Sequence, residues 1–229
     1  MESKKGKLYI VSTPIGNLED ITLRAIRVLK EAGIIAAEDT RHTKHLLNHY
    51  QISTTLTSYH DFNKEEKAEI LIVRMKEGKD VALVSDAGTP GISDPGYFLI
   101  RRSIEEGIDI IPIPGPTASI AALSISGLPT DAFIFEGFLP KKKGQKTKKI
   151  EALRDDRRTL ILFESPHRIV KTLEELESIM GDRRAALVRE VTKVYEEVIR
   201  GGLSEVRKRL SEKKIRGEIT LIIEGKRGS

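Results

Sequence analysis

The sequence contains no cysteine and no long apolar run, and each absence excludes a class of protein. Without cysteine, a disulfide framework, a thiolate nucleophile and a cysteine-ligated zinc site are all excluded. The five histidines are scattered and lie outside any HExxH pattern, so no metal site is expected. No apolar run approaches the length of a membrane span and no signal-like stretch follows Met1, which predicts a cytoplasmic protein.

Two nucleotide-binding signatures are also missing. The chain holds no GxxxxGK[ST] sequence, so no P-loop is expected. The stretch 88–91, GTPG, lacks the GxGxxG spacing and places a proline where a helix amide would have to face a pyrophosphate. A nicotinamide-binding site is therefore disfavoured.

Positive charge is concentrated in one segment. The whole chain has a formal net charge of +5, whereas residues 137–160 alone hold nine Lys or Arg against three Asp or Glu. The rest of the chain is close to neutral, which predicts a local basic patch on a protein that is not cationic overall. At 229 residues, the chain is long enough for one large domain or two small ones.

The most informative stretch is 81–96, VALVSDAGTPGISDPG. Residues 81–84 are apolar and partly β-branched, which is typical of a strand buried on both faces. The glycines and prolines that follow break the strand, and a helix is expected to begin at about Tyr97. In open α/β sheets such a junction is where ligands bind, and Asp86 would face it. A solvent loop whose glycines only satisfy the geometry of the turn is the alternative.

The turn at 86–91 is an elbow of small residues between a strand and a helix, and two further elbows follow apolar runs. Strand-like residues 7–13 lead into TPIGN at 13–17, and strand-like residues 109–113 lead into PGPTAS at 114–119. Short βα units with right-handed crossovers predict a largely parallel sheet with all three elbows on its carboxyl edge. A helix covering 43–49 is expected after the polar cluster that ends the second strand.

The pattern changes after Leu128. Strand-like runs at 132–137, 159–163, 185–190, 194–200 and 218–224 alternate with few helical segments, and the third and fourth of them lie close enough to be antiparallel neighbours. The sequence therefore predicts two α/β domains. Residues 1–128 would carry a mostly parallel sheet, and residues 129–229 a mixed α+β sheet.

Five motifs, taken together and in order, resemble those of the tetrapyrrole methylase superfamily. They lie at 12–18, 38–41, 85–91, 114–118 and 163–168, so the resemblance spans nearly the whole chain. More narrowly, they are similar to the ribosomal branch, the small-subunit ribosomal RNA cytidine 2′-O-methyltransferases. The precorrin and diphthine branches typically have Gly-Asp-Pro where this chain has Ser85-Asp86-Ala87, which favours the RNA branch.

The resemblance implies a tetrapyrrole-methylase-like fold that holds S-adenosylmethionine in a cleft between the two domains, usually as a homodimer. The chain positions that match the family's cofactor contacts are Pro14, Asp86, Ala87, Gly88, Thr89, Thr117, Ala118, Phe163, Glu164, Arg189, Ile219 and Thr220. Carboxylate and ribose groups need converging polar partners, while adenine needs a slot of small apolar and backbone groups. No metal is required, because the sulfonium already activates the methyl group.

Methyl transfer to a ribose hydroxyl would be helped by a base or by stabilisation of the developing charge. Asp39, Glu164 and Glu190 are the candidate bases, and Arg41 is expected to act beside them; a salt bridge at the rim is the alternative for each. The RNA-binding candidates are Arg41, Arg168, Lys141, Lys142, Lys143, Lys146, Lys148 and Lys149, with Arg189 as a further candidate phosphate contact. For the lysines, a solvated linker face is the alternative.

Two other functions compete with methylation of small-subunit ribosomal RNA. The same cleft could accept a corrinoid or another small molecule, although the lysine segment and the first elbow speak against it. The chain could also be an RNA- or ribosome-binding module that retains the fold without activity.

Overall fold

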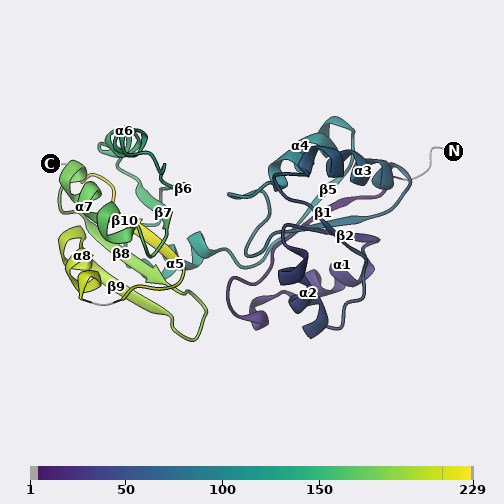
Figure 1. The fold of residues 1–229 in the computed structure, drawn as a ribbon, viewed down its shortest axis with the longest axis horizontal. Helices are drawn as coiled ribbons and strands as arrows, with labels where there is room; N and C mark the ends of the chain where they lie inside the picture. Colours follow the sequence, from purple (N-terminus) through teal and green to yellow (C-terminus); the bar gives the residue numbers. More distant parts are fainter. Residues whose placement is uncertain (1–4, 213, 228–229) are drawn as a thin grey trace. The chain divides into compact units, whose positions relative to one another are not determined.

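The computed structural model describes residues 5–212 and 214–227 and divides the chain into two compact units (Figure 1). The division falls between Thr117 and Ala118, and so differs from the boundary predicted after Leu128. Helix α5 (Ala118–Ser126) belongs to the second unit, because Leu123 is buried in a cluster with Ile161 and Ile222. Among the described residues, no helix is long and apolar enough to cross a membrane.

The first unit is built on a five-stranded sheet in the order β3-β2-β4-β1-β5. Its strands are β1 (Leu8–Val11), β2 (Ile34–Ala37), β3 (Leu56–Ser58), β4 (Val81–Val84) and β5 (Ile110–Ile113). All neighbouring strands pair in parallel. The predicted parallel sheet is therefore confirmed, and the elbows after β1, β4 and β5 share its carboxyl edge.

Helices cover both faces of this sheet, which explains why β4 is buried along its whole length. The helices are α1 (Leu23–Glu31), α2 (Thr40–His49), α3 (Lys64–Lys76) and α4 (Gly96–Glu105), with a short 3-10 turn at Leu18–Asp20. Ala82 and Val84 pack with α1 and α2, whereas Val81 and Leu83 pack with α3 and α4. Figure 1 shows these helix pairs on opposite sides of the strands.

Side-chain caps set where two of these helices begin. Thr22 caps α1, because its hydroxyl accepts a hydrogen bond from the backbone N–H of Ala25 at 3.1 Å. Helix α2 begins at Thr40, earlier than the predicted residue 43, because the Asp39 carboxylate accepts from the backbone N–H of Arg41 at 2.8 Å. Asp39 is thus a helix cap as well as a candidate site residue.

The second unit contains a mixed sheet in the order β6-β7-β10-β8-β9. Its strands are β6 (Phe133–Phe138), β7 (Thr159–Glu164), β8 (Arg184–Arg189), β9 (Glu197–Gly202) and β10 (Ile219–Ile223). Only β6 and β7 pair in parallel; the β7–β10, β10–β8 and β8–β9 pairs are antiparallel. The mixed sheet and the antiparallel β8–β9 hairpin are both as predicted.

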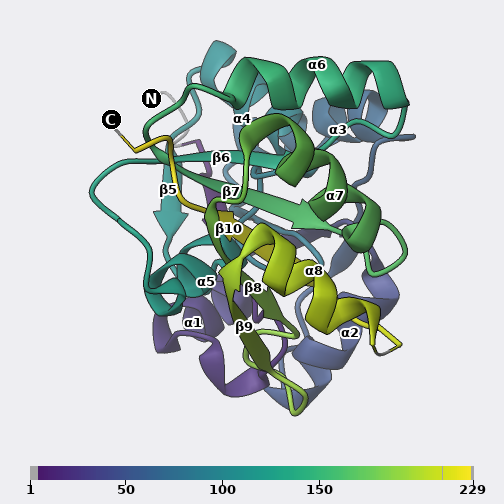
Figure 2. The same ribbon diagram turned by 90° about the vertical axis from the view of Figure 1, so that its left-hand side faces the viewer.

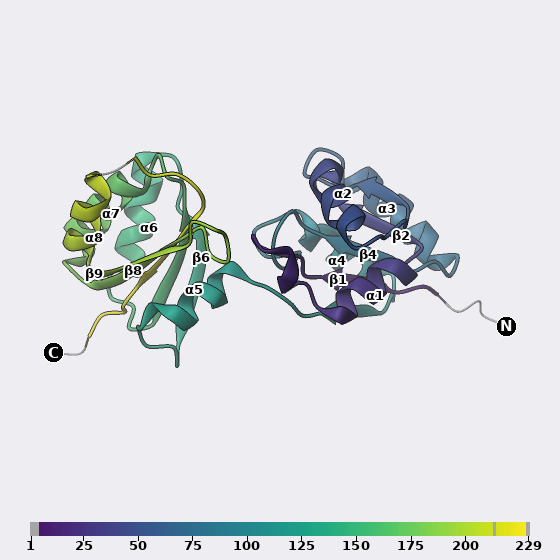
Figure 3. The same ribbon diagram turned by 90° about the horizontal axis from the view of Figure 1, so that it is seen from below.

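Four helices cover the second sheet. Helices α6 (Lys143–Leu153), α7 (Ile169–Met180) and α8 (Leu203–Ser211) pack on one face (Figure 2), and α5 packs on the other (Figure 3). The lysine-rich segment is therefore largely helical. Its side chains at 146, 150 and 153 are buried, so this segment is not a linker.

Candidate functional site

The elbows after β1 and β4 are joined to each other by backbone hydrogen bonds. The N–H of Thr13 donates to the carbonyl of Gly88 at 2.9 Å, and the N–H of Gly88 donates back at 3.0 Å. Gly88 has a φ of +81°, a left-handed conformation that side chains disfavour. The hydroxyl of Thr13 also donates to the carbonyl of Ser85 at 3.1 Å. The elbows after β1 and β4 therefore form one hydrogen-bonded structure.

A chain of hydroxyl groups connects the elbow after β5 to the other two. Ser12 Oγ lies 2.9 Å from Thr89 Oγ1, which lies 3.0 Å from Thr117 Oγ1. Gly115 packs directly on the first elbow, since a Cβ atom there would lie 2.9 Å from the Cβ of Ser12. Three segments far apart in the sequence thus converge at one edge, as predicted.

A small cavity opens beside the first two elbows. Its volume is about 80 Å³, and it is lined by Thr13, Pro14, Leu18, His42, Thr43, His45, Leu46, Ser85 and Asp86. Asp86 is held in place because its Oδ1 accepts the backbone N–H of Asp39 at 2.9 Å. Pockets for whole cofactors are typically about 300–1,000 Å³, so this cavity has room for only part of one.

The carboxyl groups of Glu38 and Asp94 lie near that of Asp86. Burial raises the pKa of the Glu38 carboxyl, and the nearby charges of Asp86 and Asp94 raise it further. Burial also raises the pKa of Asp94, although its Oδ1 accepts the backbone N–H groups of Gly91 and Gly96 at 2.8 and 2.7 Å. The sequence did not identify Glu38 as a candidate. Glu38 directly follows β2, whose last residue pairs with the last residue of β4.

Asp39 and Arg41 form an exposed pair. The guanidinium donates to both carboxylate oxygens of Asp39, with Nε at 3.2 Å and the terminal nitrogen at 2.8 Å. These hydrogen bonds hold the pKa of Asp39 well below its usual range. A carboxylate with so low a pKa is a weak proton acceptor. The salt bridge at the rim, which was the alternative for both residues, is therefore present.

In the second unit, the predicted cofactor residues meet at one edge of the sheet. Ile219 pairs with both Glu164 and Arg189, and Thr220 pairs with Phe163. The ends of β7 and β8 and the beginning of β10 consequently lie next to one another. The rings of Phe163 and Phe135 also touch there, with centroids 5.0 Å apart.

Glu164 is buried and already has partners. Its two oxygens accept the backbone N–H of Ser165 at 2.8 Å and the hydroxyl of Thr172 at 2.7 Å. The same hydroxyl accepts from the ammonium of Lys146 at 2.7 Å. Lys146 is only 5% exposed, so it is separated from the exposed lysines with which it was grouped as an RNA contact.

The remaining candidates in this unit are also paired. The Arg189 guanidinium donates to Glu197 at 3.1 Å. Burial alone would raise the pKa of Glu190, but the N–H of Glu218 and the ammonium of Lys193 outweigh it, so this pKa is lowered. Glu190 is for that reason a poor candidate base.

The other RNA-binding candidates differ in whether their charge is already paired within the chain. Lys149 pairs with Glu136, and Arg168 lies 3.4 Å from Glu164 while donating to the carbonyl of Leu139 at 2.9 Å. Four lysines are exposed and form no ion pair with any residue of 5–212 or 214–227: Lys141, Lys142, Lys143 and Lys148. These four keep their charge available to a ligand.

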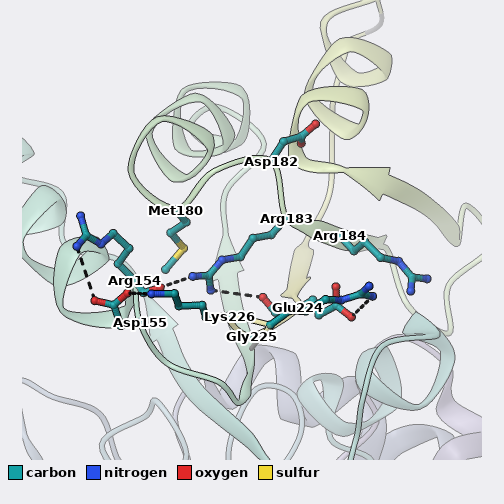
Figure 4. A pocket seen from close by; sticks show the side chains of 10 residues that line it. Arg154, Asp155, Met180, Asp182, Arg183, Arg184, Glu224, Gly225 and Lys226 are labelled. Atoms are coloured by element: carbon teal, nitrogen blue, oxygen red, sulfur yellow. Dashed lines mark hydrogen bonds and ion pairs between the residues drawn. The ribbon is translucent and has the colours of Figure 1, made fainter. Parts of the chain in front are cut away.

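A larger cavity of about 480 Å³ lies in the second unit (Figure 4). It adjoins the beginning of β8 and the end of β10, whereas the predicted cofactor residues lie at the opposite ends of these strands. Most of its cations already have partners: Lys226 pairs with Asp155 at 2.7 Å, and Arg183 donates to the carbonyls of Arg154 and Glu224. We assign no function to this cavity. Among the described residues, no group of three or more His, Asp or Glu side chains is placed to hold a metal ion.

Comparison with known proteins identifies the class. The family model of tetrapyrrole (corrin/porphyrin) methylases matches residues 7–207, and the chain belongs to this family. A crystal structure of uroporphyrin-III C-methyltransferase from Thermus thermophilus, complexed with S-adenyl homocysteine, has the same fold. Its TM-score is 0.67 at 22% identity, covering 96% of this chain and 97% of that one.

Within that family, the chain is similar to proteins named ribosomal RNA small subunit methyltransferase I. The protein of that name from Halalkalibacterium halodurans is 55% identical over 221 residues, covering 96% of this chain and 76% of that protein. The one from Thermotoga maritima is 47% identical over 221 residues, covering 96% of this chain and 99% of that protein. The resemblance inferred from the five motifs is thus confirmed.

Proposed function

We propose that the chain transfers a methyl group from S-adenosylmethionine to the 2′-hydroxyl of a cytidine in small-subunit ribosomal RNA. The observation that carries this proposal is the similarity, over nearly the whole chain, to proteins named ribosomal RNA small subunit methyltransferase I. The converging elbows supply the kind of site that such a reaction needs. The protein acts in the cytoplasm as a homodimer, on ribosomal RNA or on the assembled small subunit.

The residues at the elbows fit the cofactor. Hydroxyls of Thr89 and Thr117 and the carboxylate of Asp86 offer acceptors and donors for ribose and amino-acid groups, and Ala87 and Gly88 allow close approach. The cavity beside them has room for only part of the ligand. The other predicted cofactor residues belong to the second unit, where Phe163, Glu164, Arg189, Ile219 and Thr220 share one edge of the sheet and Ala118 begins α5.

When bound, the cofactor supplies an activated methyl group. The chain's own contribution is to place the ribose hydroxyl in line and to exclude water from it. A proton acceptor near the hydroxyl speeds the transfer further. The roles given to Asp39, Arg41 and Glu164 stay predictions, and physical grounds favour Glu38 over Asp39 as the proton acceptor. Glu38 has the raised pKa, whereas the pKa of Asp39 is lowered by Arg41.

Replacing Glu38 by glutamine is expected to lower the rate of methyl transfer about a hundredfold or more, since the amide cannot accept a proton. In the wild type, activity should fall as the pH drops through the raised pKa of Glu38, and this acid limb should be absent from the residual activity of the variant. Single-turnover rates across the pH range measure both effects. Asp39→Asn is the matched control, because an amide oxygen still caps α2; a larger loss in Asp39→Asn than in Glu38→Gln would restore Asp39 as the base.

The reaction itself is tested by incubating the protein with methyl-labelled S-adenosylmethionine and small subunits from a strain that lacks this modification. Nuclease protection followed by mass spectrometry then locates the label. Label on a cytidine ribose is the expected result. Bound cofactor with no transfer to subunits or free ribosomal RNA would instead favour a non-catalytic binding module, and transfer to a corrinoid would favour a small-molecule methylase.

A further inference from the structure

A groove of about 510 Å³ runs along α2 in the first unit, between this helix and the residues that lead into β3. Its lining residues are Thr40, Arg41, Lys44, Leu47, Asn48, Ile52, Ser53, Thr54 and Leu56. Helix α2 also borders the small cavity beside the elbows, through His42, Thr43, His45 and Leu46. The helix thus presents one face to the elbows and another to the groove.

The charge of the groove is of one sign. Two cationic side chains and no carboxylate line it, whereas Asp155, Asp182 and Glu224 are among the residues that line the cavity in the second unit. Lys44 is exposed and forms no ion pair with any described residue. Two of the five N–H donors of Arg41 bind Asp39, so three remain for a ligand. Lys44 therefore offers its charge to an anion, and Arg41 offers N–H donors to a phosphate in particular.

The floor and the rim of the groove differ in polarity. Leu47 and Ile52 are buried at 4% and 6% exposure and give an apolar floor. The exposed side chains of Asn48 and Ser53 add an amide and a hydroxyl beside it. Cations for a phosphate, polar groups for ribose hydroxyls and an apolar surface for a base together match a nucleoside phosphate.

The far wall of the groove is fixed before any ligand binds. Gln51 adopts a left-handed conformation with a φ of 53° and ends α2, and the N–H of Ile52 then donates to the carbonyl of Leu47 at 2.8 Å. The hydroxyl of Thr54 donates to the carbonyl of Leu29 at 2.6 Å, which ties the wall to the end of α1. A ligand would therefore meet a site that is already ordered, and little entropy would be lost in ordering it.

We propose that this groove binds a nucleotide of the single-stranded RNA substrate next to the target, with its phosphate on Arg41 and Lys44. The inference rests on the proposed function and adds the surface that receives the RNA strand. RNA recognition of this kind favours unpaired nucleotides, whose bases are free to enter a pocket. A free mononucleotide has the same chemistry, so the experiment must separate the two sources.

The test compares Lys44→Glu with Lys208→Glu, which reverses the charge of another exposed helical lysine outside the groove. Binding to unmodified small subunits is measured over a range of salt concentrations, together with binding of S-adenosylmethionine. We expect Lys44→Glu to weaken subunit binding about tenfold and to reduce the salt slope by about one, with cofactor affinity unchanged. Subunits containing 4-thiouridine should cross-link to peptides within residues 40–56 of the wild type.

Three outcomes would overturn the inference. The first is equal RNA binding by both variants; the second is loss of cytidine 5′-monophosphate binding in Lys44→Glu with subunit binding intact, which would assign the groove to a free nucleotide. The third is a change in sedimentation of Lys44→Glu alone, which would make the groove a protein interface. If the wild type itself neither binds nor methylates small subunits, the proposed function fails independently of the groove.

Discussion

Replacing Lys146 by alanine is expected to destabilise the second unit by about 3–5 kcal/mol, because it removes the cation from a buried polar network. The ammonium lies 2.9 Å from Glu175 and donates to Thr172 at 2.7 Å, and Thr172 in turn donates to Glu164. The contact with Glu175 is held by charge, since Glu175 Oε2 makes no aligned hydrogen bond with any described residue. Without Lys146, the carboxylate of Glu175 would lose its cation and the hydroxyl of Thr172 would lose a donor.

Urea unfolding followed by circular dichroism measures this loss. Lys148→Ala is the matched control, because Lys148 lies on the same helix but is exposed and forms no ion pair with any described residue. We expect Lys148→Ala to leave the unfolding midpoint nearly unchanged and to weaken RNA binding at low salt. An unchanged midpoint in Lys146→Ala would show that the network contributes no stability.

The strands of the first unit could be predicted because strands that are buried on both faces consist of apolar residues. Residues 81–84 are apolar at every position, and the structure buries them on both faces of a parallel sheet. The elbows were predictable for a related reason: glycine and proline break the chain at the ends of buried runs. Once the sheet is parallel, these breaks must share one edge, and the hydroxyl contact between Ser12 and Thr89 follows from that placement.

Helix α6 was not predicted, because a run of lysines is usually solvated. Its signal was nonetheless present, since Lys146, Ile150 and Leu153 are spaced to lie on one face of a helix. The long side chain of Lys146 shares that face and reaches the buried Thr172, which composition alone cannot reveal. Glu38 was missed for a similar reason: its pKa is raised by burial and by the charges of Asp86 and Asp94, and only the folded chain brings these about.

Replacing Gly115 by alanine is expected to reduce the affinity for S-adenosylmethionine at least tenfold. The new Cβ atom would lie 2.9 Å from the Cβ of Ser12, closer than real side chains approach. Ser12 has little freedom to retreat, since its N–H donates to Ile113 and its hydroxyl contacts Thr89. The first and third elbows must therefore separate, at a cost in folding stability of about 1–3 kcal/mol. Equilibrium dialysis with the labelled cofactor measures the affinity.

Gly144→Ala is the control for this change, because a Cβ at position 144 would meet no atom within 4 Å apart from its chain neighbours and the backbone of its own helix. That variant should bind the cofactor like the wild type, and it should be as stable or slightly more so, since alanine favours the helix. Loss of stability in Gly115→Ala without loss of affinity would mean that the spacing of the elbows supports only the fold. Loss of affinity well beyond the loss of stability would mean that the cofactor depends on all three elbows being held together.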